Sequence, residues 1–139
     1  MPNSREHRDK ASHNCAFLQT FEVDDYPDWV AVAAFYAAVH LVERLRTVAP
    51  SPTTKHSTDH VDRGRFARAK HRQIQREYHE LYNTSLIARY ETTSGFNTKI
   101  KPADVRHILV GKYLTAIESY VDFFFAPRTP AGRRPCAGR

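Results

Sequence analysis

A strongly basic stretch lies in the middle of the chain, between Arg63 and Arg76. It contains six lysines or arginines and no carboxylate. On a helix that advances about 100° per residue, the apolar side chains of this region share one side and the basic ones the other. The apolar side holds Phe66, Ala67, Ile74, Tyr78 and Leu81, and the opposite stripe holds Arg65, Arg68, Arg72, Arg76 and His79. The pattern predicts a basic ridge on the outer face of a core-packed helix.

Phosphate recognition is the chemistry that such a ridge suits best. A guanidinium is planar, stays charged and offers a fork of donors that matches two phosphate oxygens. An RNA strand along the ridge would release counterions at each contact. A solvated charged face, helped by Glu77 and Glu80, and a surface for a partner protein are the alternatives. The candidate nucleic-acid-binding residues are Arg65, Arg68, Arg72 and Arg76.

Two further polar residues, His60 and Arg63, fall on the apolar side of the same helical projection. Charged groups on a core face are unfavourable unless they are paired. Either Gly64 breaks the helix and frees them, or they line a polar pocket inside the bundle or at a dimer interface. His40 shares a face with Trp29 and apolar residues in the preceding apolar segment, where a histidine is either a core residue or part of a site.

Several segments, in order and at fitting distances, resemble small prokaryotic HEPN-domain proteins. The resemblance spans about residues 5–123. It is carried by Ala11, His13 and Asn14, then Tyr26-Pro27-Asp28-Trp29 and Phe35-Tyr36-Ala37-Ala38-Val39-His40, then Ser57 with His60 and Arg63, then Tyr78, Leu81 and Tyr82, and finally Ser85 with Ala88-Arg89-Tyr90.

The resemblance implies a helical bundle, usually dimeric, in a superfamily rich in RNases of toxin–antitoxin, CRISPR and anti-phage systems. Active members carry Arg-x4–6-His, and two copies of this motif meet across the dimer without a metal. In such a site a histidine moves the protons of the attacking 2′-hydroxyl, and an arginine stabilises the phosphorane charge. This sequence offers three matches, Arg8/His13, Arg65/His71 and Arg72/His79.

Only the last match places both side chains on one face of a helix, about two turns and roughly 10 Å apart. Joint action on one phosphate would therefore need a bend or a second chain. The resemblance itself points to His60, Arg63, Arg89 and Tyr90, and not to Arg72 or His79. Leu86 stands where such proteins often carry an arginine. The candidate catalytic residues are His60, Arg63, Arg72 and His79, with a supporting polar pocket of His40, Arg89 and Tyr90.

Three functions follow from these residues. The first is a metal-independent endoribonuclease of a toxin–antitoxin or anti-phage system, acting as a dimer. The second is a non-catalytic HEPN module that binds RNA, a nucleotide or a protein partner such as an antitoxin, and it predicts that His60 and Arg63 are held in internal hydrogen bonds. The third is an interaction subunit of a larger complex. Whether the protein is an enzyme stays open.

The elements that must position these residues are helices. Hydrophobic spacing and breakers predict helices over about 4–22, 27–48, 59 into the 80s with a bend at Gly64 or near Ser85, and 102–126. Residues 49–58 are expected to form a loop and 91–101 a turn-like link. The last helix should bury one stripe at 3/4 spacing, comprising Val105, Leu109, Tyr113, Ala116, Tyr120 and Phe123. The expected fold is all-α, an up-and-down bundle of four to five HEPN-like helices.

Length and charge set the organisation of the chain. Its 139 residues allow one HEPN-like helical domain, 1–126, followed by a disordered basic tail, 127–139. The formal charge is +6, but the tail contributes four arginines and no acid, so residues 1–127 carry only +2. The eight histidines include no HExxH motif, so neither a metal nor another cofactor is expected. Without a signal peptide or a membrane span, a cytoplasmic location is expected.

Overall fold

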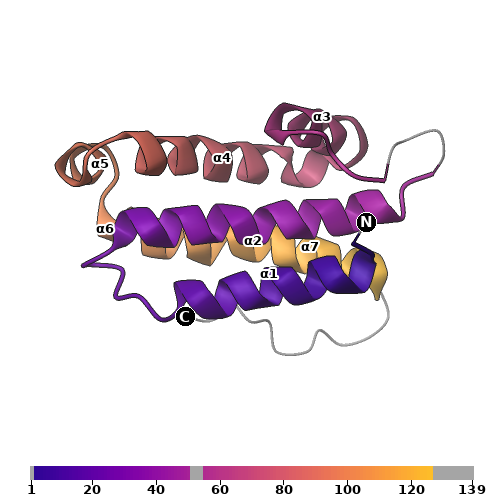
Figure 1. The fold of residues 1–139 in the computed structure, drawn as a ribbon, viewed down its shortest axis with the longest axis horizontal. Coiled ribbons are helices and arrows are strands. Elements are labelled where there is room, and N and C mark those ends of the chain that lie inside the picture. Colours follow the sequence, from indigo (N-terminus) through magenta and orange to yellow (C-terminus); the bar gives the residue numbers. More distant parts are fainter. Residues whose placement is uncertain (1, 51–54, 127–139) are drawn as a thin grey trace.

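The computed structural model describes residues 2–50 and 55–126, and every regular element in these ranges is helical (Figure 1). The all-α class is therefore confirmed. In chain order the elements are α1 (Ser4–Leu18), α2 (Pro27–Thr47), α3 (His60–Lys70), the short 3₁₀ turn η1 (Arg72–Ile74), α4 (Gln75–Tyr90), α5 (Thr93–Lys99), α6 (Pro102–Asp104), the π-helix η2 (Val105–Leu114) and α7 (Thr115–Phe125). The tail predicted over 127–139 lies outside the described residues.

The first two helices begin where their local sequence favours a start. Asn3 and Glu6 form a capping box at the first turn of α1, each side chain bonding the backbone N–H of the other. α1 ends at Leu18, earlier than predicted, because the Thr20 hydroxyl donates to the Phe17 carbonyl and closes the last turn there. α2 has Pro27 in its first turn, where a missing N–H does no harm, and it matches its predicted range closely.

Helix α2 is the central element, as its nearly all-round apolar sequence predicted. Figure 1 shows it running between α1 on one side and α4 on the other, with α7 behind it, and α2 contacts all three. Fourteen of its residues are buried, including the charged Glu43 and Arg46 near its end. A central helix that carries two buried charges must find partners for them, and these partners come from the segment that follows.

The prediction of one long helix from residue 59 into the 80s is wrong, because this region forms α3, η1 and α4. The helix breaks at His71, whose φ of −137° and ψ of 59° leave the helical region, and not at Gly64 or near Ser85. The His71 ring packs against Phe66, Tyr120 and Phe124, and its Nδ1 lies 2.7 Å from the Tyr120 hydroxyl. These contacts from the far end of the chain hold the break. Figure 1 shows the result, with α3 turned well away from the axis of α4.

The turn-like link predicted over residues 91–101 is also wrong, because most of it forms α5. Thr92 caps this helix by accepting a hydrogen bond from the Gly95 N–H. Phe96 is fully buried in the main core. Local polarity made this segment resemble a turn, but one aromatic anchor is enough to dock a short helix onto the bundle.

The final helical region has the predicted extent but buries a different face. Over η2 the chain turns more widely, with i→i+5 hydrogen bonds, so contacts recur every four to five residues instead of every three to four. The buried side chains are Val105, Leu109, Val110, Leu114, Ile117, Glu118 and Val121. The expected stripe fails beyond Leu109: Tyr113, Ala116 and Tyr120 are only half-buried, and Phe123 is 67% exposed.

Over the described residues, no helix combines the length and the apolar character that crossing a bilayer requires.

Candidate functional site

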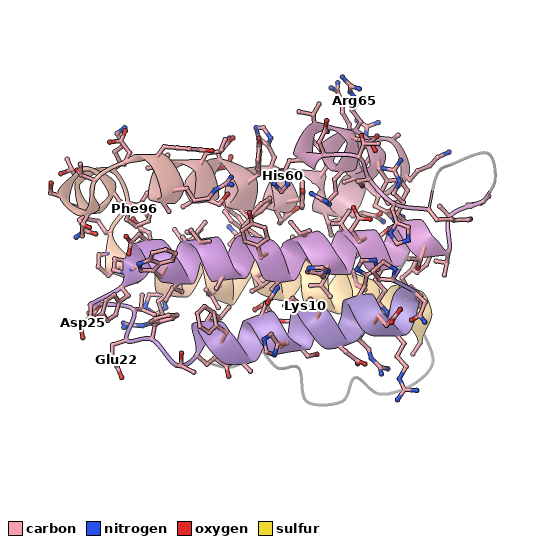
Figure 2. The ribbon with its side chains drawn as sticks, in the orientation of Figure 1. Lys10, Glu22, Asp25, His60, Arg65 and Phe96 are labelled. Atoms are coloured by element: carbon pink, nitrogen blue, oxygen red, sulfur yellow. The ribbon has the colours of Figure 1, made fainter. Side chains whose placement is uncertain are left out.

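A pocket opens between α3 and the first half of α4. Its volume is about 290 Å³. Arginines of α3 and ring side chains of α4 face it, and no carboxylate belongs to its lining. Figure 2 shows Arg65 on the outer side of α3 and His60 at the end of α3 that lies over α4. The lining residues are His60, Val61, Gly64, Arg65, Arg68, Gln75, Tyr78, His79 and Tyr82.

The break at His71 creates this pocket. It turns α3 away from the line of α4. Residues at one-turn spacing on α3 (His60, Gly64, Arg68) therefore face those on α4 (Gln75, Tyr78, Tyr82) across the pocket, instead of continuing one straight row. Two ion pairs then attach the start of α3 to the end of α2, Arg46–Asp62 at 3.2 Å and Arg63–Glu43 at 2.7 Å. α3 is therefore held on the central helix, and its outer arginines have a fixed direction.

Arg63 lies beneath the pocket and is held from three sides. Its Nε donates to Glu43 Oε1 at 2.7 Å, and Nη1 lies 2.7 Å from His60 Nδ1 and 3.5 Å from the Tyr78 hydroxyl. α3 is unbroken at Gly64, so the prediction of a break there is wrong, and the alternative of a polar pocket inside the bundle fits the contacts. Nε and Nη1 of the guanidinium therefore both face internal partners.

Electrostatics keep the Arg63–Glu43 pair ionised. Burial alone would raise the pKa of the Glu43 carboxyl, but hydrogen bonds from Ser57 and Arg63 outweigh it and hold the pKa below its usual value. Burial also opposes the charge of Arg63, but Tyr78 and Glu43 raise its pKa overall. Burial raises the pKa of the Tyr78 hydroxyl. The pair contributes a fixed charge distribution below the pocket.

The contact with Arg63 also decides what His60 can do. Burial first, then the charges of Arg63 and Arg89, lower the pKa of His60, so the ring is neutral near pH 7. A guanidinium can only donate, so Nδ1 of His60 must accept and Nε2 must carry the proton. His60 is therefore a neutral N–H donor, suited to binding a phosphate oxygen.

The four arginines of the predicted ridge are all exposed, but they do not form one row. Arg65 and Arg68 lie on α3 and line the pocket, whereas Arg72 lies in η1 and Arg76 in α4, and neither lines it. Across residues 2–50 and 55–126, no carboxylate lies within ion-pair distance of any of the four. The positive charge of the ridge is not neutralised by this part of the chain.

His79 lines the pocket without Arg72, its partner in the sequence motif. The exposed imidazole has Nε2 at 3.1 Å from Asn83 Nδ2, one turn along α4. The break at His71 separates the two members of the motif onto different elements. The pocket therefore brings together His60 and His79, two of the four candidate catalytic residues, and leaves Arg72 outside it.

The expected supporting pocket of His40, Arg89 and Tyr90 is not one group of lining residues. His40 Nδ1 lies 3.0 Å from Nδ1 of His7, on α1. Arg89 donates to the Ser85 carbonyl and lies over the Tyr90 ring at 5.6 Å. Tyr90 is 79% exposed. Arg89 acts on the pocket only through its charge, which lowers the pKa of His60.

Sequence reasoning missed Glu43, which holds Arg63, and Gln75 and Tyr82, which line the pocket. Glu43 had a detectable signal, since a carboxylate in an otherwise apolar central helix needs a cationic partner from another element. Gln75 had none, because its place in the pocket depends on the break at His71, and Tyr82 appeared only among the residues that carry the HEPN resemblance.

Chemically, the pocket can bind an anion and an aromatic ring together. Two guanidiniums and an imidazole N–H favour phosphate oxygens. The half-buried Tyr82 lines the pocket with its ring, beside which a nucleobase can stack, whereas the ring of Tyr78 is buried against Phe35. Comparison of the chain with protein-family models, curated proteins and solved structures found no match.

Proposed function

We propose that the protein binds single-stranded RNA in the pocket between α3 and α4. The observation that carries this proposal is that one carboxylate-free pocket is lined by Arg65, Arg68, His60 and His79. A pocket of about 290 Å³ is too small for a duplex, and unpaired bases are the part of an RNA that proteins bind in pockets, so we expect a single strand there. Arg72 and Arg76 extend the positive surface for neighbouring phosphates.

The fold and setting that accompany this proposal are those of the HEPN resemblance. α1, α2, α4 and the region from α6 to α7 run alternately up and down, with α2 at the centre, which supports a HEPN-like bundle. On that reading the protein is a homodimer in the cytoplasm, where an antitoxin or a larger defence complex is its partner. The internal hydrogen bonds of Arg63 are those expected of the non-catalytic module.

Metal-independent cleavage of the bound RNA is a second candidate, favoured by one observation, that two imidazoles line the same pocket. In this reaction the 2′-oxygen attacks the adjacent phosphorus and the bond to the 5′-oxygen breaks, leaving a 2′,3′-cyclic phosphate and a 5′-hydroxyl. His79 would accept the 2′-hydroxyl proton and, as the imidazolium, transfer a proton to the leaving 5′-oxygen, while the neutral His60 would donate a hydrogen bond from Nε2–H to a phosphorane oxygen. Arg63 would be a positioning residue for His60.

The binding test compares Arg65→Ala/Arg68→Ala with a charge-matched control, Arg5→Ala/Lys10→Ala, on α1, which lies across α2 from α3 and α4 (Figure 1). The affinity for a fluorescent single-stranded RNA is measured against salt concentration with EDTA present. Each phosphate contact to a single strand contributes about 0.7 to the slope of log K against log salt. The loss of two contacts should therefore reduce the slope by about 1.4, which corresponds to roughly 25-fold weaker binding at 0.1 M salt if the two proteins bind equally at 1 M. Equal losses in both variants would contradict the proposal.

The same samples decide between binding and cleavage. RNA that stays intact in every lane, with binding retained, identifies a binding module. Cleavage in EDTA that is lost in His79→Ala, and kept in a variant of the exposed His13, identifies the nuclease. A 2′-deoxy substitution at the cleaved position should abolish cutting without abolishing binding, because the nucleophile alone has been removed.

A further inference from the structure

A second cluster of polar side chains lies beside the Arg63–Glu43 pair, on the side away from the pocket. It joins His7 of α1, Glu43 of α2 and His56, which precedes α3. One ligand atom from each of the three side chains lies within 4.8 Å of the other two. His56 Nδ1 and Glu43 Oε2 are 3.8 Å apart. Three separate elements therefore direct two imidazoles and a carboxylate to one point.

One ring nitrogen of His7 is buried at this point without a hydrogen-bond partner among the described residues. The side chain of His7 is buried, with 4% of the residue exposed, and the nitrogen without a partner is Nε2. Nδ1 lies 3.0 Å from Nδ1 of His40, so one of these two nitrogens carries a proton and the other accepts it. If His7 Nδ1–H donates, Nε2 is a buried lone pair without a donor, which is unfavourable unless something binds it.

We propose that His7, Glu43 and His56 bind a divalent transition-metal ion, with Zn²⁺ the preferred occupant and water at the fourth position. Two imidazoles and one carboxylate are a ligand set that zinc takes in sites with one open coordination position. Mg²⁺ and Ca²⁺ prefer all-oxygen ligands, so the two nitrogens disfavour them. The proposal departs from the sequence-based expectation of no metal, because that expectation rested on local histidine motifs, whereas these ligands come from α1, α2 and the segment before α3.

The surroundings support each ligand. His40 would hold Nδ1–H of His7 and leave Nε2 for the metal, and the Ser57 N–H donates to Glu43 Oε2 at 3.3 Å. Burial lowers the pKa of His7, and burial with the neighbouring charges of His7, Lys10 and Arg63 lowers that of His40 to about 4. Both rings are therefore neutral near pH 7, which is the form that binds metals.

The geometry needs only a small contraction. Zinc ligands at about 2.0–2.1 Å from the metal lie roughly 3.3 Å from one another in a tetrahedron, compared with the separations of up to 4.8 Å here. His56 lies outside any helix, its ring already contacts the His7 ring at 5.4 Å between centroids, and its side chain is 14% exposed, so water can reach the fourth position. Glu43 shares its charge with Arg63, which weakens the site relative to one with a carboxylate of its own.

The test is Zn²⁺ titration of the full chain by calorimetry, with Co²⁺ as a spectroscopic probe of coordination. The wild type should bind one Zn²⁺ per chain with a dissociation constant below about 10 µM, and Co²⁺ should give the visible absorption of a four-coordinate site. His56→Ala and His7→Gln should each weaken binding at least about tenfold. His13→Ala and His107→Ala, at exposed histidines, should bind as the wild type does.

Two variants are used so that a folding defect in one does not decide the result. His56 lies outside the helices, and Gln at position 7 keeps a polar group that can bond to His40, so far-UV circular dichroism should show folded protein for both. Failure of the wild type to bind Zn²⁺ would overturn the proposal. Binding that survives in both His56→Ala and His7→Gln, or that is lost equally in His13→Ala, would also overturn it.

Discussion

Replacement of Arg63 by methionine keeps most of the side-chain length but removes the guanidinium that lies between Glu43, His60 and Tyr78. The side chains of Arg63 and Glu43 are only 11% and 6% exposed. Removal of one partner from a buried ion pair costs about 3–5 kcal/mol, because the other charge is left without a partner. Glu43 keeps its hydrogen bond from the Ser57 N–H, so we expect the lower end, about 3 kcal/mol.

The assay is urea unfolding followed by far-UV circular dichroism at pH 7, with EDTA present so that no metal contributes. In thermal unfolding of the same samples, a loss of about 3 kcal/mol corresponds, for a chain of this length, to a fall in Tm of roughly 10 °C. The double variant Glu43→Gln/Arg63→Met removes both charges and should recover part of the loss, with a coupling energy of about 2 kcal/mol.

The exposed pair Glu91–Lys99 is the matched control. Its atoms are also close, at 2.6 Å, but its side chains are 38% and 53% exposed, so solvent screens the charges. The corresponding cycle, Glu91→Gln/Lys99→Met, should give a coupling energy below about 1 kcal/mol. The reasoning is refuted if Arg63→Met costs less than about 1 kcal/mol, or if the two coupling energies are equal.

Three further predictions concern the fold. Ile117→Ala should cost about 2–5 kcal/mol in urea unfolding and Phe123→Ala under about 1 kcal/mol, because the wide turn of the π-helix before α7 leaves Ile117 buried and Phe123 exposed. A larger loss for Phe123→Ala than for Ile117→Ala would mean that the regularly spaced stripe is the buried face. Phe96→Ala should cost about 3–5 kcal/mol, and a value near zero would mean that α5 is not docked. Burial lowers the pKa of His71 below its unfolded value of about 6.5, so the unfolded chain binds protons first as pH falls, and stability should decrease below about pH 6.5. His71→Gln should flatten that part of the pH–stability curve, and an unchanged curve would mean that this ring is protonated without penalty.

The sequence predicts the helical class and the central helix because both depend on long stretches of local pattern. The run from Pro27 to Thr47 has a proline start, helix formers and few charges, and the structure keeps it nearly unchanged. The break at His71 could not be predicted, because it depends on Tyr120 and Phe124, about 50 residues away in the chain. The same holds for the wide turn of η2, which no composition rule marks.

The candidate site divides in the same way. The position of Arg63 on an apolar helix face left three alternatives: a helix break at Gly64, a polar pocket inside the bundle or one at a dimer interface. Its contacts with Glu43, His60 and Tyr78 are of the second kind. Which residue would pair with it depended on packing between α2 and α3. The Arg72/His79 spacing assumed one straight helix, so it lost its meaning when that helix broke.

The most direct test of RNA binding at the α3–α4 pocket is photo-crosslinking of the full chain to a single-stranded RNA that carries 4-thiouridine, with the crosslinked peptides identified by mass spectrometry. We expect crosslinks at Tyr82 and His79, whose side chains line the pocket. Exposed aromatic side chains elsewhere, Phe17 on α1 and Phe123 on α7, are internal controls in the same experiment. Crosslinks confined to these controls, with none on α3 or α4, would contradict binding at the pocket.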